Sequence, residues 1–158
     1  MDASAVERAL AGQDAAICVL GSGKKLKSTI RSEGTEQIVR AMEKVGMRRL
    51  ICLSTLGTGE SWGNLDFYWK YVMFGFILRQ VFADHERQEA LVRNSTLDWT
   101  IVRPGALTDG PLTGDYRHSF PSTDRDITLQ ISRADVADFI LKQLADRASL
   151  FQAPSLSY

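Results

Sequence analysis

The chain has 158 residues, a length that suits one compact domain with a single hydrophobic core. Its 44% hydrophobic and 24% charged residues argue against disorder, fibrous repeats and a disulfide scaffold. Nineteen basic residues balance nineteen acidic ones, so no overall positive field is available to hold nucleic acid or an anionic membrane.

The first third of the chain alternates helix and strand patterns. An amphipathic turn covers residues 5–11, and the apolar run AAICVL at 15–20 suits a central strand of a parallel sheet. Apolar residues recur at helical spacing over 29–45, and Gly46 follows as a C-cap. A second strand is predicted at once after it, over 49–53.

The two cysteines, Cys18 and Cys52, lie inside these apolar runs, where a thiol usually acts as a small buried hydrophobe. The start of the chain is amphipathic and acidic, unlike a signal peptide. We therefore expect a cytoplasmic protein. No metal site is predicted, because two isolated histidines and two strand cysteines lack ligand spacing.

A long helical region is predicted from about residue 65 to residue 93, with an interruption near Gly75 or Asp84. Its aromatic residues, between Phe67 and Phe76, could wall a pocket for a flat substrate, or could equally serve core packing or a subunit interface. The apolar part, 71–78, is far shorter than the roughly 20 residues of a membrane span.

The last part of the chain continues the alternation. A third strand at 99–102 ends at Arg103-Pro104-Gly105, a short strand covers 127–131, and Ser132 is the N-cap of the final helix. Residues 150–151 are a candidate last strand. Strands that alternate with helices predict right-handed βαβ units, and hence an α/β fold with a Rossmann-type parallel sheet and flanking helices.

Ligands of such sheets bind beyond the carboxyl ends of the strands. The residues that follow the three strands are Gly21-Ser22-Gly23, Ser54-Thr55 and Arg103-Pro104-Gly105-Ala106-Leu107. Glycines let a backbone approach a ligand closely, and hydroxyls can hydrogen-bond a ribose or a substrate carbonyl.

Neither of the two glycine-rich phosphate motifs occurs in the chain, since Leu26 stands where a third glycine would be needed. A nearby basic cluster has two interpretations, a phosphate contact or, the one we favour, a solvated loop face. Its members are Lys24, Lys25, Lys27 and Arg31.

The proton donor of ordinary short-chain dehydrogenases, a tyrosine four residues before a lysine, does not occur here. This disfavours alcohol dehydrogenase chemistry and leaves a reductase whose substrate takes its proton from water. His85, between Asp84 and Glu86, is the candidate group that titrates near pH 7, and the alternative, which we favour, is an exposed helix histidine.

Three segments together resemble a known family. DHERQEALVRNSTLDWTIVRPGALTDGPLTGDYR at 84–117, Ser54-Thr55, and Ile131-Ser132-Arg133-Ala134-Asp135-Val136-Ala137 are similar to the atypical short-chain dehydrogenase/reductases that bind NAD(P)H. This NmrA-like group includes NADH-flavin reductase-like and biliverdin-IXβ reductase-like proteins. The segment at 9–15 is similar to the approach to the family's fourth strand.

The resemblance implies one NAD(P)-binding Rossmann-like domain over residues 1–158, corresponding to the carboxyl-terminal part of the family's domain without its amino-terminal glycine-rich strand-turn-helix. NADP or NAD is the implied cofactor. The implied catalytic residues are Ser54, Thr55 and His85. The implied cofactor-binding residues are Leu20, Gly21, Ser22, Leu53, Ser54, Thr55, Arg103, Pro104, Gly105, Ala106 and Leu107.

The leading functional hypothesis is an NAD(P)H-dependent reductase that passes hydride directly to a flat small molecule such as a flavin, bilin or quinone. The alternatives are a non-catalytic NAD(P)-sensing or interaction protein, and an inactive truncated fragment. In the family's strand order, the strand at 15–20 pairs with a strand absent from this sequence. Its open apolar edge predicts a homodimer through Ala15 to Leu20.

Overall fold

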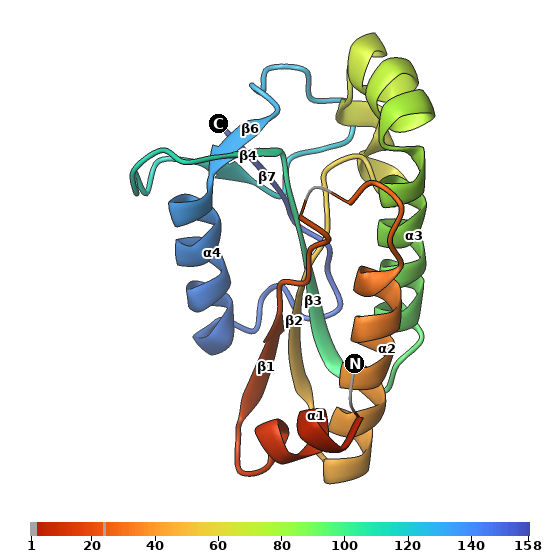
Figure 1. Cartoon of the computed structure of the whole chain (residues 1–158). Helices are drawn as coiled ribbons and strands as arrows, with labels where there is room; N and C mark the ends of the chain where they lie inside the picture. Colours follow the sequence, from red (N-terminus) through yellow and green to blue (C-terminus); the bar gives the residue numbers. More distant parts are fainter. Residues whose placement is uncertain (1–2, 24) are drawn as a thin grey trace.

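The structure is a computed structural model that describes residues 3–23 and 25–158. A mainly parallel sheet lies at its centre (Figure 1). In spatial order the strands are β1 (Ala15–Cys18), β2 (Arg49–Leu53), β3 (Asp98–Pro104), β7 (Ser155–Ser157) and β5 (Arg117–His118), of which only β5 is antiparallel to its neighbour. A second, two-stranded parallel sheet joins β4 (Ala106–Thr108) to β6 (Gln130–Ser132).

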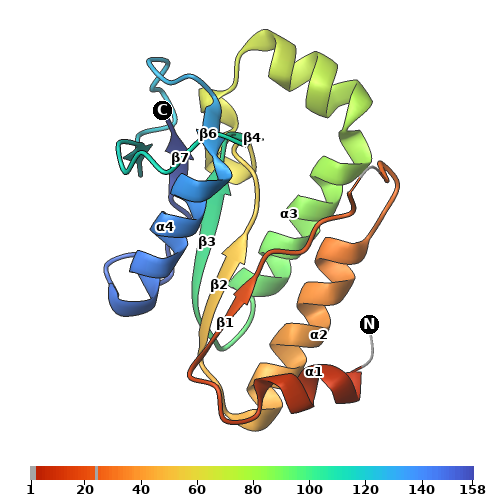
Figure 2. The same cartoon turned by 60° about the vertical axis from the view of Figure 1, so that its left-hand side comes forward.

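Helices cover both faces of the sheet (Figures 1 and 2). Helices α2 (Ile30–Val45) and α3 (Arg79–Arg93) lie on one face, α4 (Arg133–Ala145) lies on the other, and α1 (Ala3–Leu10) packs beside α2. Two further segments, the 3-10 helix η1 (Gly59–Asn64) and the π-helix η2 (Tyr68–Ile77), lie between β2 and α3. The predicted α/β Rossmann-type sheet with flanking helices is confirmed.

The core has two layers because successive residues of a strand point to opposite faces of the sheet. Leu50 and Ile101 pack toward α2 and α3, where they meet Met42 and Val92. Ile51 belongs to the layer under α4, whose other members include Val102, Phe139 and Ile140. Burial on both faces explains why these strands are nearly continuous apolar runs in the sequence.

Several predicted elements are confirmed within a few residues. The helix predicted over 29–45 is α2, and Gly46 caps it in the left-handed conformation at φ 76°. The strand predicted over 49–53 is β2, and the 15–20 strand is β1, which ends at Cys18. Ser132 caps α4 as expected, with its Oγ accepting a hydrogen bond from the Asp135 backbone N–H at 3.0 Å.

Three predicted elements need correction. The long helix is interrupted at Leu78, between η2 and α3, and not at Gly75 or Asp84. The strand predicted over 127–131 is confined to 130–132, because Leu129 has a positive φ of 58° that breaks the extended backbone. The last strand lies at 155–157 and not at 150–151, where Phe151 turns the chain at φ 57°.

The outer edge of β1 pairs with no other strand among the described residues, since its one neighbour is β2. Ile17 of β1 is 41% exposed, and Val19, just after the strand, is 57% exposed. No helix in the described part of the chain has the length and apolar character that crossing a membrane requires. The two cysteines are buried free thiols, as expected.

Candidate functional site

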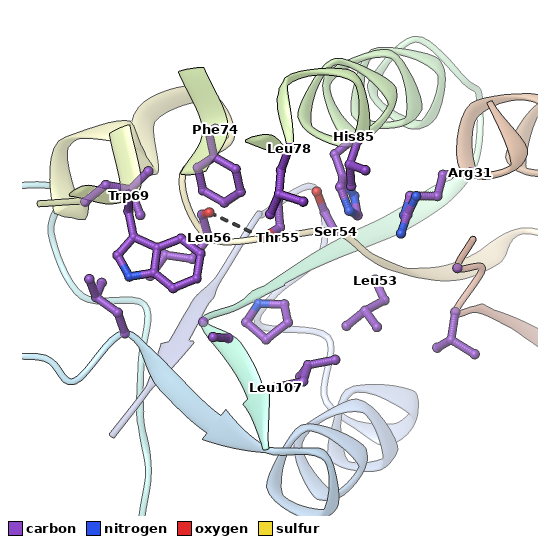
Figure 3. Close-up of a pocket in the computed structure, with 18 of the residues that line it drawn as sticks. Arg31, Leu53, Ser54, Thr55, Leu56, Trp69, Phe74, Leu78, His85 and Leu107 are labelled. Carbon is purple, nitrogen blue, oxygen red and sulfur yellow. Dashed lines mark hydrogen bonds between the residues drawn. The ribbon is translucent and has the colours of Figure 1, made fainter. Parts of the chain in front are cut away.

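A cavity of about 440 Å³ opens beyond the carboxyl ends of β1, β2 and β3 (Figure 3). Its walls come from the segments that follow these strands, from η2 and the start of α3, and from β4 and the β6 region. The lining residues are Val19, Leu20, Gly21, Arg31, Leu53, Ser54, Thr55, Leu56, Leu65, Trp69, Phe74, Leu78, Val81, His85, Pro104, Gly105, Ala106, Leu107, Leu129 and Arg133.

Most residues of the predicted site come together in this cavity. They are Leu20, Gly21, Leu53, Ser54, Thr55, His85, Pro104, Gly105, Ala106 and Leu107. The two others, Ser22 and Arg103, do not line it. The parallel topology brings the strand ends together, which explains why residues far apart in the sequence share this cavity.

Arg103 belongs to a buried ion pair. Its side chain is 1% exposed, and its Nε and Nη2 donate to the two carboxylate oxygens of Glu89 at 2.9 and 2.6 Å. Its Nη1 lies 2.9 Å from a carboxylate oxygen of Glu60. Glu89 comes from α3, so the pair fixes that helix to the end of β3, and the guanidinium points away from the cavity.

The two hydroxyls after β2 differ in their surroundings. Ser54 Oγ donates to Glu89 at 2.6 Å, which commits its proton to the buried ion pair. The nearest acceptor of Thr55 Oγ1 is the Leu56 carbonyl at 3.4 Å, a long contact. Thr55 therefore offers the hydroxyl that a ligand in the cavity can use.

His85 lies on the cavity wall and is 9% exposed, so the alternative of an exposed helix histidine is wrong (Figure 3). Burial, reinforced by the positive charge of Arg31, lowers the pKa of His85 to about 4. The expectation that it titrates near pH 7 is therefore wrong, and its imidazole is neutral there. Its Nδ1 has no hydrogen-bond partner among the described residues.

Sequence reasoning did not assign Arg31 to the site. The sequence places it in a basic cluster that we interpret as a solvated loop face. In that cluster Lys25 and Lys27 are exposed, and Lys24 lies outside the described residues. Arg31 instead turns inward at the start of α2, where its Nη1 donates to Ser22 Oγ at 3.2 Å. Arg133, at the start of α4, was also missed.

The helix η2 divides the predicted aromatic segment into two sides. Its π-helical bonds join residues five apart, as in the 2.6 Å bond from Leu78 N to Met73 O. Trp69 and Phe74 are also five apart, face the cavity and lie 5.6 Å from each other between ring centroids (Figure 3). Phe67, Tyr71 and Phe76 on this segment are exposed.

Curated proteins of similar sequence include one from yeast. The UPF0659 protein YMR090W of Saccharomyces cerevisiae is 30% identical over 145 residues. The match covers 89% of this chain and 60% of the yeast protein, so the chain spans less than two thirds of that relative's length.

Solved structures share the fold. The oxidoreductase ylbE from Lactococcus lactis is 25% identical with a TM-score of 0.80, over 99% of this chain and 67% of that one. ChuY of Escherichia coli O157:H7, described as an anaerobilin reductase, is 29% identical with a TM-score of 0.75. The match covers 98% of this chain and 70% of ChuY. A short-chain dehydrogenase/reductase from Veillonella parvula, solved in complex with NADP, is 19% identical with a TM-score of 0.81. The match covers 100% of this chain and 69% of the Veillonella chain, and at this identity it supports the fold alone.

The model of the NAD(P)H-binding protein family matches residues 1–147. This match confirms the cofactor class expected from the sequence, NADP or NAD, and agrees with the strand-end cavity described above. The chain belongs to the NAD(P)H-binding family, as the resemblance to atypical short-chain dehydrogenase/reductases implied.

Proposed function

We propose that the chain forms the acceptor-binding side of an NAD(P)H-dependent reductase that reduces a flat small molecule of the flavin, bilin or quinone type. The observation that carries the proposal is the cavity itself. Trp69 and Phe74 form one wall, and the segment Pro104–Leu107 forms another, so a planar ring would lie between an aromatic and an apolar surface. The descriptions of ylbE as an oxidoreductase and of ChuY as a reductase support the same class of reaction.

The lining residues fit the nicotinamide end of the cofactor. Leu53 and Leu107 supply apolar contacts for a flat ring, and Thr55, whose hydroxyl makes only the long contact with the Leu56 carbonyl, can bind a ribose. A Cβ added at Gly21 would meet nothing within 4 Å, so a ligand can approach the backbone there. When bound, NAD(P)H supplies the hydride. The chain's own residues orient the acceptor.

The described residues do not show a cradle for the cofactor's pyrophosphate. The helix amino termini that could bind phosphate are already occupied, because the Asp84 carboxylate accepts from the backbone N–H groups of Arg31 and Ser32 at the start of α2. At the start of α4, Ser132 Oγ accepts a hydrogen bond from the Asp135 backbone N–H. The fit is therefore limited to the nicotinamide half.

No lysine, tyrosine, aspartate or glutamate is among the described residues that line the cavity, and His85 is neutral at pH 7. The acceptor's proton therefore comes from solvent in this mechanism, as the missing tyrosine-lysine pair predicts. The same observation favours the second candidate, an NAD(P)-sensing protein without turnover.

The first test is titration of the purified chain with NADPH and NADH, followed by nucleotide fluorescence and by the rise in melting temperature that a ligand of the folded state causes. Saturable binding together with FMN-dependent oxidation of the nucleotide is the expected result. Binding without turnover would select the sensing protein. No binding at millimolar nucleotide would overturn both functions for this chain.

We also propose that the open edge of β1 pairs with a second copy of the chain, because an unpaired apolar edge recruits other strands. Sedimentation should show a dimer that Ile17→Lys dissociates and that Val45→Lys, an exposed change at the end of α2, leaves intact. A monomeric unmodified chain would contradict the proposal.

A further inference from the structure

The charges that line the cavity have one sign. Arg31 and Arg133 are its charged lining residues, and neither aspartate nor glutamate belongs to the described lining set. Arg133 is largely exposed and already pairs with Asp109, so its charge is screened by water and by its partner. Arg31 lies at the α2 end of the cavity, is 12% exposed, and forms only a long ion pair, at 3.8 Å, with Asp84 (Figure 3).

Arg31 keeps hydrogen-bond donors free for a ligand. Its Nη1 contacts Ser22 Oγ, but no described residue accepts a hydrogen bond from its Nε or Nη2. Asp84 lies 3.8 Å from Nη1, too far for a hydrogen bond, and its oxygens already accept from two backbone N–H groups and from the Ser32 hydroxyl. The acid next to Arg31 is therefore committed to capping α2.

His85 is the second half of this arrangement. Its Nδ1 is shielded from solvent, and the Gln88 side chain acts on the imidazole as a hydrogen-bond partner, so the nitrogen that a ligand in the cavity can reach is Nε2. Figure 3 shows His85 and Arg31 pointing toward the same end of the cavity, and the positive charge of Arg31 acts on the imidazole. A neutral imidazole that carries its proton on Nε2 can donate to the same oxygen-rich group as the guanidinium.

We propose that Arg31 and His85 form an anion subsite that selects acceptors carrying a carboxylate or phosphate group beside their flat ring. The inference rests on the proposed function, since it assumes that the cavity holds the acceptor. It adds the substrate class, because the guanidinium and the imidazole can donate hydrogen bonds to an anionic group but not to a neutral hydrocarbon ring. The apolar walls bind the ring and the subsite fixes its acidic arm.

FMN and riboflavin provide a matched pair of probes, because they share one ring system and differ by a phosphate group. Quenching of flavin fluorescence by the whole chain gives both dissociation constants without any turnover. We expect FMN to bind at least about tenfold more tightly than riboflavin, as a charge-assisted hydrogen bond implies. Arg31→Gln should remove most of this difference by weakening FMN alone, and Arg31→Lys should restore part of it.

The control variant is Arg40→Gln, which removes an exposed guanidinium of α2 that pairs with Glu36. It should leave both flavin affinities unchanged. His85→Phe, which removes the ring nitrogens, should also weaken FMN more than riboflavin. Because a variant could disturb the fold, each one is compared with the unmodified chain in melting temperature before its affinities are used.

The outcomes separate the inference from the proposed function. Equal affinities of the unmodified chain for the two flavins overturn the anion subsite and leave the flat-acceptor function standing. Failure of both flavins to bind overturns the two together. If Arg31→Gln weakens NADPH while the FMN to riboflavin ratio stays constant, the guanidinium serves a cofactor phosphate, and the proposed selection of acceptors is wrong.

Discussion

Arg103 and Glu89 face each other in the interior, where Nε and Nη2 of the guanidinium donate to the two oxygens of the carboxylate at 2.9 and 2.6 Å. The arginine comes from the end of β3 and the glutamate from the middle of α3. Ser54, at the end of β2, adds a third hydrogen bond to the same carboxylate. Three elements that border the cavity are thus tied together behind its wall.

Glu89→Gln should lower the free energy of unfolding by about 3–5 kcal/mol, because it leaves the Arg103 cation buried without its main counter-charge. Urea denaturation measures the loss. Glu36→Gln is the matched control, since it removes an exposed carboxylate that pairs with Arg40 and should cost at most about 1 kcal/mol. Equal effects of the two substitutions would mean that the buried pair does not stabilise the fold.

Gly105→Ala should destabilise the chain and narrow the cavity. A Cβ on this residue would lie 2.5 Å from the Leu129 carbonyl oxygen, so the β4 and β6 segments would have to separate, at a cost of about 1–3 kcal/mol. Gly21→Ala is the control, because a Cβ there meets nothing within 4 Å. Thermal denaturation of both variants decides the matter, and an unchanged melting temperature for Gly105→Ala would contradict the close packing.

The stability of the chain should fall between pH 6.5 and pH 4 because of His85. Its pKa is about 4 in the folded chain and about 6.5 in an unfolded one, so the unfolded state binds the proton first as the pH falls. The contribution of His85 to the free energy of unfolding is fully present above pH 6.5, and about 2 kcal/mol of this contribution is lost by pH 5.

Urea titrations of the unmodified chain and of His85→Gln at pH 7 and pH 5 measure this contribution. The variant should lose less stability over the interval than the unmodified chain. Identical losses would show that the imidazole is not the group responsible, and a proton NMR titration that gives a pKa near 6.5 would contradict its burial.

Tyr158→Phe should destabilise the end of the chain. The Tyr158 hydroxyl donates to Asp135 Oδ2 at 2.6 Å and accepts from the Ser132 backbone N–H at 3.0 Å, so its removal leaves a buried donor unsatisfied, at about 1–3 kcal/mol. Tyr71→Phe removes an exposed hydroxyl on η2 and should have no measurable effect on the melting temperature.

Tyr158→Phe should also change how the stability of the chain depends on pH in acid. Although burial raises the pKa of Asp135, hydrogen bonds from Tyr158, Gly114 and Thr113 bring it well below its usual range. A lowered carboxyl pKa contributes stability that is present above the unfolded value and is lost as the pH falls below it. Tyr158→Phe should therefore raise the pKa of Asp135 and reduce this acid-labile contribution. An unchanged acid denaturation curve would contradict this.

Local sequence patterns predicted the elements that regular periodicity specifies. The apolar spacing before Gly46 predicted α2, and the continuous apolar run at 49–53 predicted β2, because each pattern is a direct consequence of which faces the element buries. The rule that ligands bind at the carboxyl ends of parallel strands then located the cavity near Gly21, Thr55 and Gly105.

Tertiary structure decided the chemistry of the individual side chains. Arg103 belongs to β3 and precedes the cavity residue Pro104, yet its guanidinium does not line the cavity because it is bound to Glu89 of α3. His85 is neutral and Arg31 faces inward because of burial and of charges that lie far away in the sequence. The amino-acid sequence alone therefore determined β1, α2, β2 and the place of the cavity, since these depend on local periodicity and on the parallel order of the strands. Orientation, protonation and charge of the site depend on partners that only folding brings together.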